Sequence, residues 1–225
     1  MKKFLSLLLV LALSLSLVAC AGGSTAPATE ATEATEEAAA TEAPAAEAAA
    51  EGITIGTISP NTGSLAAYGT AVTTGVDLAI SEINAAGGIL GQQVTVINAD
   101  DQMDPTETLN AFNSLVSQGV GLIIGSVASS CTSAITGAAN EEGVVLLTPA
   151  STADSITTED DYVFRACYAD GFQGAIAAYY ASQAGYTDVG VVYCAADTYS
   201  KGLYDSFKTA AAKYGINVVA EESTA

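Results

Sequence analysis

The chain has 225 residues, of which 25 are acidic and only 6 are basic, giving a net charge of −19 at pH 7. So acidic a surface repels nucleic acid, whose recognition depends on neutralising phosphates. The sequence contains no histidine, which excludes Ser-His-Asp and Cys-His catalysis and histidine-ligated metal sites within this chain. We therefore predict a protein that is not an enzyme, binds no nucleic acid, and carries no cofactor and no metal.

Residues 1–20 have the pattern of an export signal. A short basic start precedes an apolar run of 15 residues, Phe4 to Val18, which is shorter than the roughly 20 residues that span a membrane. The run ends in Leu17-Val18-Ala19-Cys20, which resembles the lipobox of bacterial lipoproteins. That resemblance implies a lipid attached to Cys20 and an extracytoplasmic protein anchored to the cell membrane. An ordinary signal peptide with a chance cysteine is the alternative.

Residues 21–51 consist almost entirely of Ala, Thr, Glu, Pro and Gly. Without Val, Ile, Leu or aromatic residues, this segment buries too little apolar surface to offset the entropy of ordering. We predict a disordered linker that holds a folded domain away from the membrane.

From residue 52 onward, short apolar runs alternate with helical patterns. The predicted strands lie at residues 53–58, 94–97, 122–125, 144–147, 162–165, 189–193 and 216–219. Helical spacing of apolar residues lies between them, as in these three sets: Val72, Val76, Ala79, Ile80 and Ile83; Leu109, Phe112 and Val116; Leu203, Phe207, Ala210 and Tyr214. This alternation predicts an α/β fold with doubly wound parallel sheets. Because the pattern restarts after Gly171, we expect a first ligand-binding lobe at 52–168 and a partial second lobe at 169–225.

Local signals mark two helix ends. Ala86-Gly87-Gly88 is a glycine stop for the first helix. Asp104, Pro105 and Glu107 stand in the order of an N-cap, a first-turn proline and an acidic residue three positions after the cap. A further helix is expected from about Ser129 to Glu142.

Two hydroxyl-rich turns follow predicted strands, at residues 126–130 and 148–152. The carboxyl edge of a parallel sheet is where open α/β folds bind ligands, and hydroxyls with free backbone N–H groups suit a small carboxylate. The alternative is that these Ser and Thr residues only cap helices and fill turns.

Other chemistries fit the sequence poorly. The glycines at 87–91 follow a helix instead of opening one, so they do not form a dinucleotide turn. Asp100, Asp101 and Asp104 lack the further ligands of a calcium loop. Besides Cys20, the chain has Cys131, Cys167 and Cys194; we expect them to be buried small apolar residues, although one pair could form a disulfide.

Several stretches resemble one family in order and spacing from about Gly52 to Ala225: Ser59–Gly63, Tyr68-Gly69, Asn84–Gly91, Asp100-Asp101, Asp104-Pro105 and the two hydroxyl turns. They are similar to type I extracytoplasmic solute-binding proteins of the branched-chain amino acid (leucine/isoleucine/valine) transport branch. The resemblance implies two flavodoxin-like lobes that close around an amino acid or small amide, which an ABC permease then takes up. A ligand-sensing domain for a signalling partner is the alternative.

The same resemblance implies these ligand contacts: Tyr68, Ser129, Ala150, Ser151, Thr152 and Tyr199. Ser129 and Thr152 correspond to hydroxyl donors at the carboxylate and ammonium end of the ligand, and Ala150 contributes its backbone carbonyl. The two tyrosines correspond to aromatic residues from the first and second lobes.

Two departures from the family pattern matter. A disulfide found in some members is missing, because its positions are Met103 and Ala128 here. Family members also continue past Ala225, so we expect the chain to be a fragment whose second lobe is incomplete. The acidic residue that holds the ligand's ammonium group in the family would lie beyond that point. Within this chain, Asp170 is a weaker candidate for that contact, and the alternative is that it only caps a helix.

Overall fold

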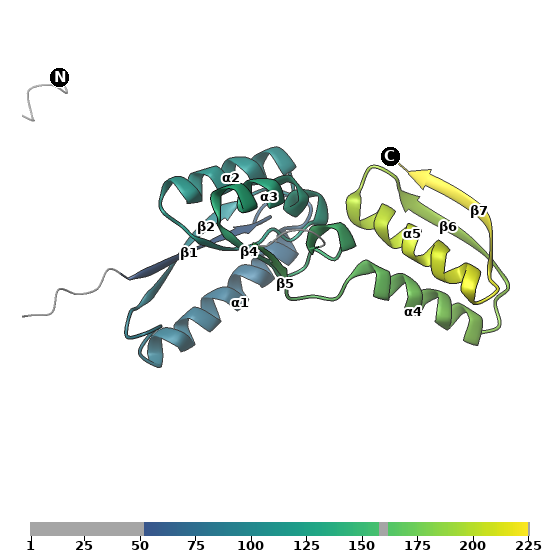
Figure 1. Ribbon diagram of the computed structural model, residues 1–225, viewed down its shortest axis with the longest axis horizontal. Coiled ribbons are helices and arrows are strands. Elements are labelled where there is room, and N and C mark those ends of the chain that lie inside the picture. Colours follow the sequence, from purple (N-terminus) through teal and green to yellow (C-terminus); the bar gives the residue numbers. More distant parts are fainter. Residues whose placement is uncertain (1–51, 158–161, 225) are drawn as a thin grey trace, which may run out of the picture. The chain divides into compact units, whose positions relative to one another are not determined.

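The computed structural model describes residues 52–157 and 162–224 (Figure 1). The predicted export signal, the lipid site at Cys20 and the linker lie outside the described residues. The strands are β1 (Ile53–Ser59), β2 (Val94–Asp100), β3 (Leu122–Ile124), β4 (Val145–Thr148), β5 (Val163–Arg165), β6 (Asp188–Cys194) and β7 (Asn217–Thr224). The helices are α1 (Ala66–Ala85), α2 (Pro105–Ser117), α3 (Ser129–Glu142), α4 (Asp170–Gln183) and α5 (Thr198–Lys213), with a 3-10 turn at Asp154–Thr157.

The first sheet has five parallel strands in the order β2-β1-β3-β4-β5. Figure 1 shows α1 on one face of this sheet and α2 with α3 on the other. The doubly wound arrangement predicted from the sequence is therefore confirmed, and the carboxyl ends of β1, β3 and β4 share one edge.

The core of this part lies between the sheet and helices α2 and α3. Its fully buried members include these side chains: Ile58, Phe112, Leu115, Ile123, Ile135, Leu146 and Ile156. The prediction that Leu109, Phe112 and Val116 form the buried face of α2 is partly wrong. Leu109 is 38% exposed, and Leu115 is buried instead. The helix is rotated so that the face at positions 108, 112 and 115 meets the sheet.

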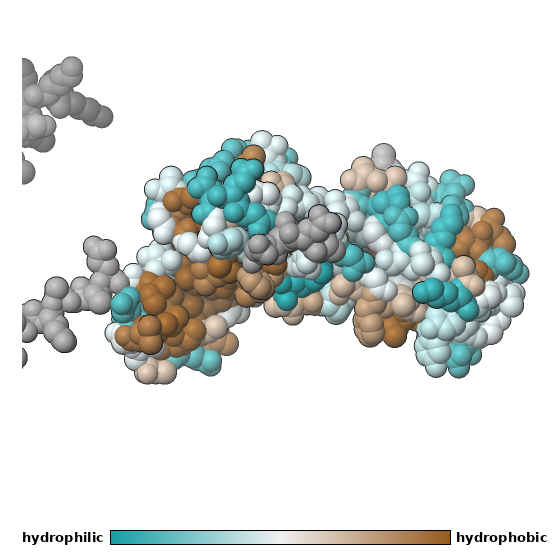
Figure 2. All heavy atoms as spheres, viewed as in Figure 1, coloured by the Kyte–Doolittle hydropathy of each residue, from teal (hydrophilic) through white to brown (hydrophobic). Residues whose placement is uncertain are grey.

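Helix α1 buries less than its pattern predicts. Of the predicted face, Val72, Val76 and Ile80 are half-buried, Ala79 is exposed, and the fully buried residue of the helix is Gly69. Figure 2 shows hydrophobic residues gathered over the region of α1.

Both predicted helix-end signals are confirmed. The Asp104 carboxylate accepts hydrogen bonds from the backbone N–H groups of Thr106 (2.7 Å) and Glu107 (3.1 Å), and Pro105 is the first residue of α2. After α1, Gly87 and Gly88 have φ angles of 106° and 80°, which other residues rarely adopt.

The second sheet contains β6 and β7, which pair in parallel. Helix α5 packs against these strands and α4 lies beside α5 (Figure 1). Its small core contains Ala178, Ala210, Ala211 and Ile216. The prediction that Tyr214 belongs to the core face of α5 is wrong, since this residue lies past the helix end and is exposed. Tyr204 is the buried tyrosine of α5.

Gly174 allows α4 and α5 to approach closely, and this gives a first prediction. A Cβ at this position would lie 2.5 Å from the Phe207 backbone nitrogen and 2.7 Å from the Ser206 Cβ. We expect Gly174→Ala to destabilise the protein by about 1–3 kcal/mol, because the helices would have to move apart.

The matched control is Gly137→Ala on α3, where nothing lies within 4 Å of the added Cβ. That change should stabilise the protein by about 0.5–1 kcal/mol through higher helix propensity. Urea unfolding of both variants measures the difference, and equal stability of the two would refute the packing argument.

The three cysteines of the described residues are free. Cys131 is buried as expected, whereas Cys167 and Cys194 are only half-buried, so the expectation of burial is wrong for these two. Within residues 52–157 and 162–224, no helix combines the length and apolar character needed to cross a membrane.

Candidate functional site

The two hydroxyl-rich turns lie side by side. Strands β3 and β4 pair in parallel with Ile124 opposite Leu147, so the chain leaves both strands at the same edge of the sheet. The backbone N–H of Ala153 donates a hydrogen bond to the Ser129 hydroxyl oxygen (3.3 Å), which joins the second turn to the first.

Ser129 begins α3 and is almost fully buried. No side chain caps this helix, whose N-cap residue is Ala128. The first N–H groups of a helix have no acceptor within it and favour a negative charge. Since the Ser129 oxygen accepts one hydrogen bond, its hydroxyl proton is left to donate, and this end of α3 can receive a carboxylate.

The second turn provides acceptors beside these donors. No donor among the described residues bonds to the Ala150 carbonyl. Thr152 is nearly buried, with 8% of its surface exposed, and its hydroxyl oxygen can accept a hydrogen bond. The carbonyl of Thr152 accepts a hydrogen bond from the Asp170 backbone N–H (2.8 Å). One end of the site thus donates and the other accepts, which suits a ligand that carries both charges.

Ser151 has a different environment from its neighbours. Its hydroxyl is fully buried, 2.6 Å from the Thr132 hydroxyl and within hydrogen-bond distance of the carbonyls of Ser126 (3.2 Å) and Val127 (3.1 Å). The side chain of Ser151 therefore ties the two turns together, and a contact between Ser151 and a ligand stays a prediction.

The two predicted aromatic residues are exposed and lie near helix starts. Tyr68 is in the first turn of α1, which follows the carboxyl end of β1, and it is 64% exposed. Tyr199 is in the first turn of α5 and is 40% exposed. The Gln173 side-chain amide lies 3.4 Å from the Tyr199 hydroxyl oxygen and 3.5 Å from the Asp170 carboxylate, so it links these two residues.

Asp170 is the first residue of α4 and is fully buried. Its Oδ2 atom has no hydrogen-bond partner. Burial raises the pKa of the Asp170 carboxyl above its ordinary value, and a hydrogen bond from the Thr152 side chain opposes this rise. A buried carboxylate oxygen without a partner is costly, so it favours binding of a cationic group nearby.

Sequence reasoning missed Arg165, the single arginine of the chain. Its guanidinium donates to the Ala153 carbonyl (2.8 Å) and the Thr157 hydroxyl (2.6 Å), and so holds the segment that follows the second turn. The signal available in the sequence was a lone arginine at the end of a predicted strand.

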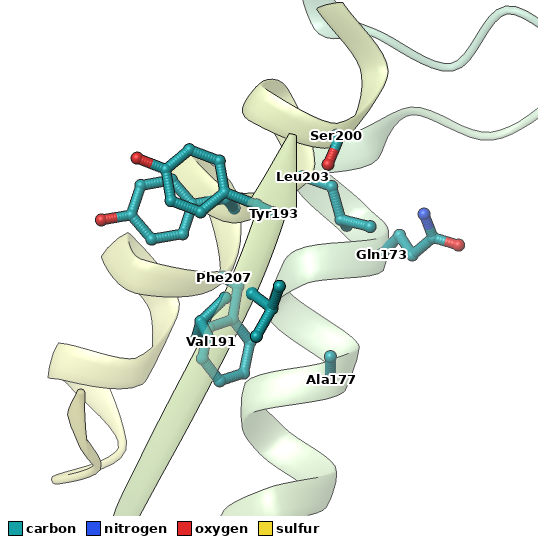
Figure 3. A pocket seen from close by; sticks show the side chains of 9 residues that line it. Gln173, Ala177, Val191, Tyr193, Ser200, Leu203 and Phe207 are labelled. Carbon is teal, nitrogen blue, oxygen red and sulfur yellow. The ribbon is translucent and has the colours of Figure 1, made fainter. Parts of the chain in front are cut away.

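A separate pocket of about 420 Å³ lies against β6 and contains none of the predicted site residues (Figure 3). Its lining is mostly apolar: Gln173, Ala177, Val191, Val192, Tyr193, Ser200, Leu203, Tyr204 and Phe207. The rings of Tyr193 and Tyr204 stack there with their centroids 4.0 Å apart. Among the described residues, no group of three or more acidic or cysteine side chains could hold a metal ion.

Comparisons with known proteins agree on one family. A profile of the periplasmic binding proteins matches residues 52–225. "Leu/Ile/Val-binding protein homolog 3" of Brucella melitensis is 36% identical over 179 residues, covering 79% of this chain and 49% of that protein. The "Leucine-, isoleucine-, valine-, threonine-, and alanine-binding protein" of Pseudomonas aeruginosa is 33% identical over 175 residues, covering 77% of this chain and 47% of that protein.

A solved structure has the same fold. The branched-chain amino acid transporter substrate binding protein LivJ of Streptococcus pneumoniae, in complex with isoleucine, matches with a TM-score of 0.72 and 37% identity, covering 77% of this chain and 50% of that chain. The chain spans about half the length of the curated relatives it matches. With its doubly wound sheet and its match over residues 52–225, the chain belongs to the periplasmic binding protein family, in the branch of the branched-chain amino acid ABC transporter substrate-binding proteins.

Proposed function

We propose that this protein is an extracytoplasmic lipoprotein that binds an amino acid, with a branched-chain one favoured, or a small amide, and delivers it to an ABC permease for uptake. The observation that carries this proposal is the pair of adjacent turns, which place donors at Ser129 and acceptors at Ala150 and Thr152 next to each other. The printed names of the relatives, which are Leu/Ile/Val-binding proteins, support the choice of ligand class.

In this proposal, the carboxylate of the ligand binds at the start of α3, where Ser129 donates and the helix N-terminus favours negative charge. The ammonium group binds at the Ala150 carbonyl and the Thr152 hydroxyl, with Asp170 as the nearby negative charge. Tyr68 and Tyr199 supply aromatic surface for the side chain of the ligand. Binding then shifts the population toward a closed form, which the permease recognises.

The domain organisation is part of the same proposal. Residues 1–20 would act as signal peptide and lipobox, with the lipid on Cys20, and residues 21–51 would act as the tether. Residues 52–168 and 169–225 would form the first lobe and part of the second. The separate sheets at residues 53–165 and 188–224 support this division.

A ligand screen tests the function. The complete native protein would be melted in the presence of each amino acid, urea and short aliphatic amides. A ligand at about one hundred times its dissociation constant adds about 2.7 kcal/mol of stability. A clear rise in melting temperature with an aliphatic amino acid is the expected result. No rise across the panel would contradict the transport proposal and leave a different ligand class or a sensing role.

Asp170 gives a prediction with opposite effects on stability and binding. Burial raises the pKa of this carboxyl in the folded state, so folding favours its protonated form. The stability that this provides is fully present below the ordinary pKa of 3.8, and it is lost as the pH rises through the higher pKa of the folded state. We therefore expect Asp170→Asn to melt at a higher temperature than the wild type at neutral pH without ligand. The two melting temperatures should converge as the pH falls toward 3.8.

Affinity for an amino acid should fall in the same variant, because the ammonium group loses a negative partner. Asp77→Asn, which changes an exposed carboxylate on α1, is the matched control and should alter neither property. A wild type more stable than Asp170→Asn at neutral pH would show that the carboxylate is well paired.

A further inference from the structure

Asp101 is a fully buried carboxylate just after β2, and the proposed ligand contacts do not include it. Its Oδ1 accepts a hydrogen bond from the Met103 backbone N–H (3.1 Å), and its Oδ2 accepts one from the Ser126 hydroxyl. The Thr108 hydroxyl lies farther away, 3.3 Å from Oδ2, and is closer to the Asp104 carbonyl (2.8 Å). No cationic side chain of the described residues forms an ion pair with Asp101.

A buried carboxylate without a cation contributes little to stability, because its desolvation cost offsets its hydrogen bonds. Its effect on geometry is larger. A carboxylate only accepts hydrogen bonds, so it fixes the direction of the Ser126 hydroxyl, which must donate to it. The first residue of the first hydroxyl turn is thereby held from the side of β2.

The carbonyl of the same serine is where the two turns meet. The Ser126 carbonyl oxygen lies within hydrogen-bond distance of three buried hydroxyls, those of Thr132 (3.2 Å), Thr148 (2.7 Å) and Ser151 (3.2 Å). Thr132 belongs to α3, Thr148 ends β4, and Ser151 belongs to the second turn. The Thr148 hydroxyl also accepts a hydrogen bond from the Ser151 backbone N–H (3.0 Å).

These contacts form one connected network from Asp101 to both turns. Ser126 lies three residues before Ser129 in the first turn, and Ser151 directly precedes Thr152 in the second. Every side chain of the network is fully buried, so no water competes for these hydrogen bonds. Without the Asp101–Ser126 hydrogen bond, the Ser126 side chain would be free to rotate. The Ser126 carbonyl would then hold the hydroxyls of the second turn less firmly, and the distance between the two turns would vary more.

From this network we infer that Asp101 is a positioning residue for the ligand site: through Ser126, it sets the relative position of Ser129 and Thr152 before a ligand arrives. The inference rests on the proposed function for the role of those two residues. The effect of Asp101 on the turns themselves does not depend on the identity of the ligand.

The first measurement is amide hydrogen exchange of the ligand-free complete protein, wild type against Asp101→Asn, which keeps the shape and removes the charge. We expect the amides of residues 126–132 and 150–153 to exchange roughly tenfold faster. A change of this size is typical of the coupling between residues that share one hydrogen-bond network. Exchange in α1 and in α4 should be unchanged. A change confined to residues 101–104, or spread evenly over the protein, would overturn the inference.

Two matched variants test whether Asp101 acts on the turns through Ser126. Ser126→Ala removes the Asp101–Ser126 hydrogen bond completely, whereas Asp101→Asn leaves one acceptor oxygen for two donors. Ser126→Ala should produce the same exchange pattern, so it replaces Asp101→Asn if that variant does not fold. Thr108→Val removes the weaker contact to the same carboxylate and should leave exchange in both turns unchanged. If Thr108→Val loosens the turns as much as Ser126→Ala does, the path through Ser126 is wrong.

The second measurement is a double-mutant cycle on L-leucine affinity by calorimetry. Asp101→Asn should weaken leucine binding about tenfold in the wild-type background but have little further effect when Ser129 and Thr152 are already alanine. Fully additive losses would show a general structural effect and contradict the inference. If the wild type does not bind leucine while exchange in both turns still rises in Asp101→Asn, the proposed ligand is wrong and the positioning role stands.

Discussion

Replacing Ser129 and Thr152 together by alanine should weaken amino-acid binding by about 2–4 kcal/mol, or roughly 30- to 700-fold. Each hydroxyl faces a charged end of the proposed ligand. One hydrogen bond to a charged group contributes about 1.5–3 kcal/mol, and losses at neighbouring residues of one site do not add fully. Both residues are nearly buried, so water does not readily replace the lost hydroxyls. Isothermal titration of the complete protein with the ligand found in the screen gives the affinity.

The control for this double variant lies on the same helix. Ser133 and Thr136 of α3 carry the same hydroxyls but lie outside the two turns. Ser133 is exposed, and the Thr136 hydroxyl donates to the Ser133 carbonyl (3.3 Å). Ser133→Ala with Thr136→Ala should leave the affinity unchanged. An unchanged affinity in the Ser129/Thr152 variant would show that the ligand binds elsewhere on the protein.

The largest expected loss of stability follows from Phe112→Ala. This side chain is fully buried between α2 and the first sheet, and removing a buried phenylalanine costs about 3–5 kcal/mol through lost burial and a remaining cavity. Domains are stable by only about 5–15 kcal/mol, so the variant should be close to unfolding at moderate temperature. Its melting temperature should fall by about 6–20 °C for a protein of this size.

Phe172→Ala is the matched control, because this phenylalanine on α4 is 64% exposed. Its effect should stay within about 0.5 kcal/mol, as for most surface substitutions. Differential scanning calorimetry compares the two variants directly. A loss below 1 kcal/mol for Phe112→Ala, by the same measurement, would mean that the core collapses around the missing ring.

The doubly wound fold was predictable because its signals are local. Continuous apolar runs indicate buried parallel strands, and the Asp104-Pro105 start of α2 fixes a helix boundary within one residue. Two of the errors concern helices. Leu109 follows helical spacing but is exposed, because which face of a helix is buried depends on packing partners that spacing alone does not give. Tyr214 follows the same spacing but lies past the end of α5.

The candidate site was only partly predictable from sequence. Hydroxyl turns after two strands predicted a candidate site at one edge of the sheet, because parallel strands bring their carboxyl ends together there. The buried contacts behind these turns were not predictable. Asp101 and Ser126 are 25 residues apart, and Arg165 reaches Ala153 across a turn, so only the folded chain brings these groups together.

The network beneath the turns also has a consequence for the rate at which a ligand is captured. Because the hydroxyls of Thr132, Thr148 and Ser151 already hold the first sheet's half of the site in place, an arriving ligand does not have to wait for these loops to order. Ligands of the same size and charge should therefore associate with similar rate constants, and differences among them should appear in how long each stays bound. In the proposed transport role, residence time is therefore the quantity on which selection between cargoes would act.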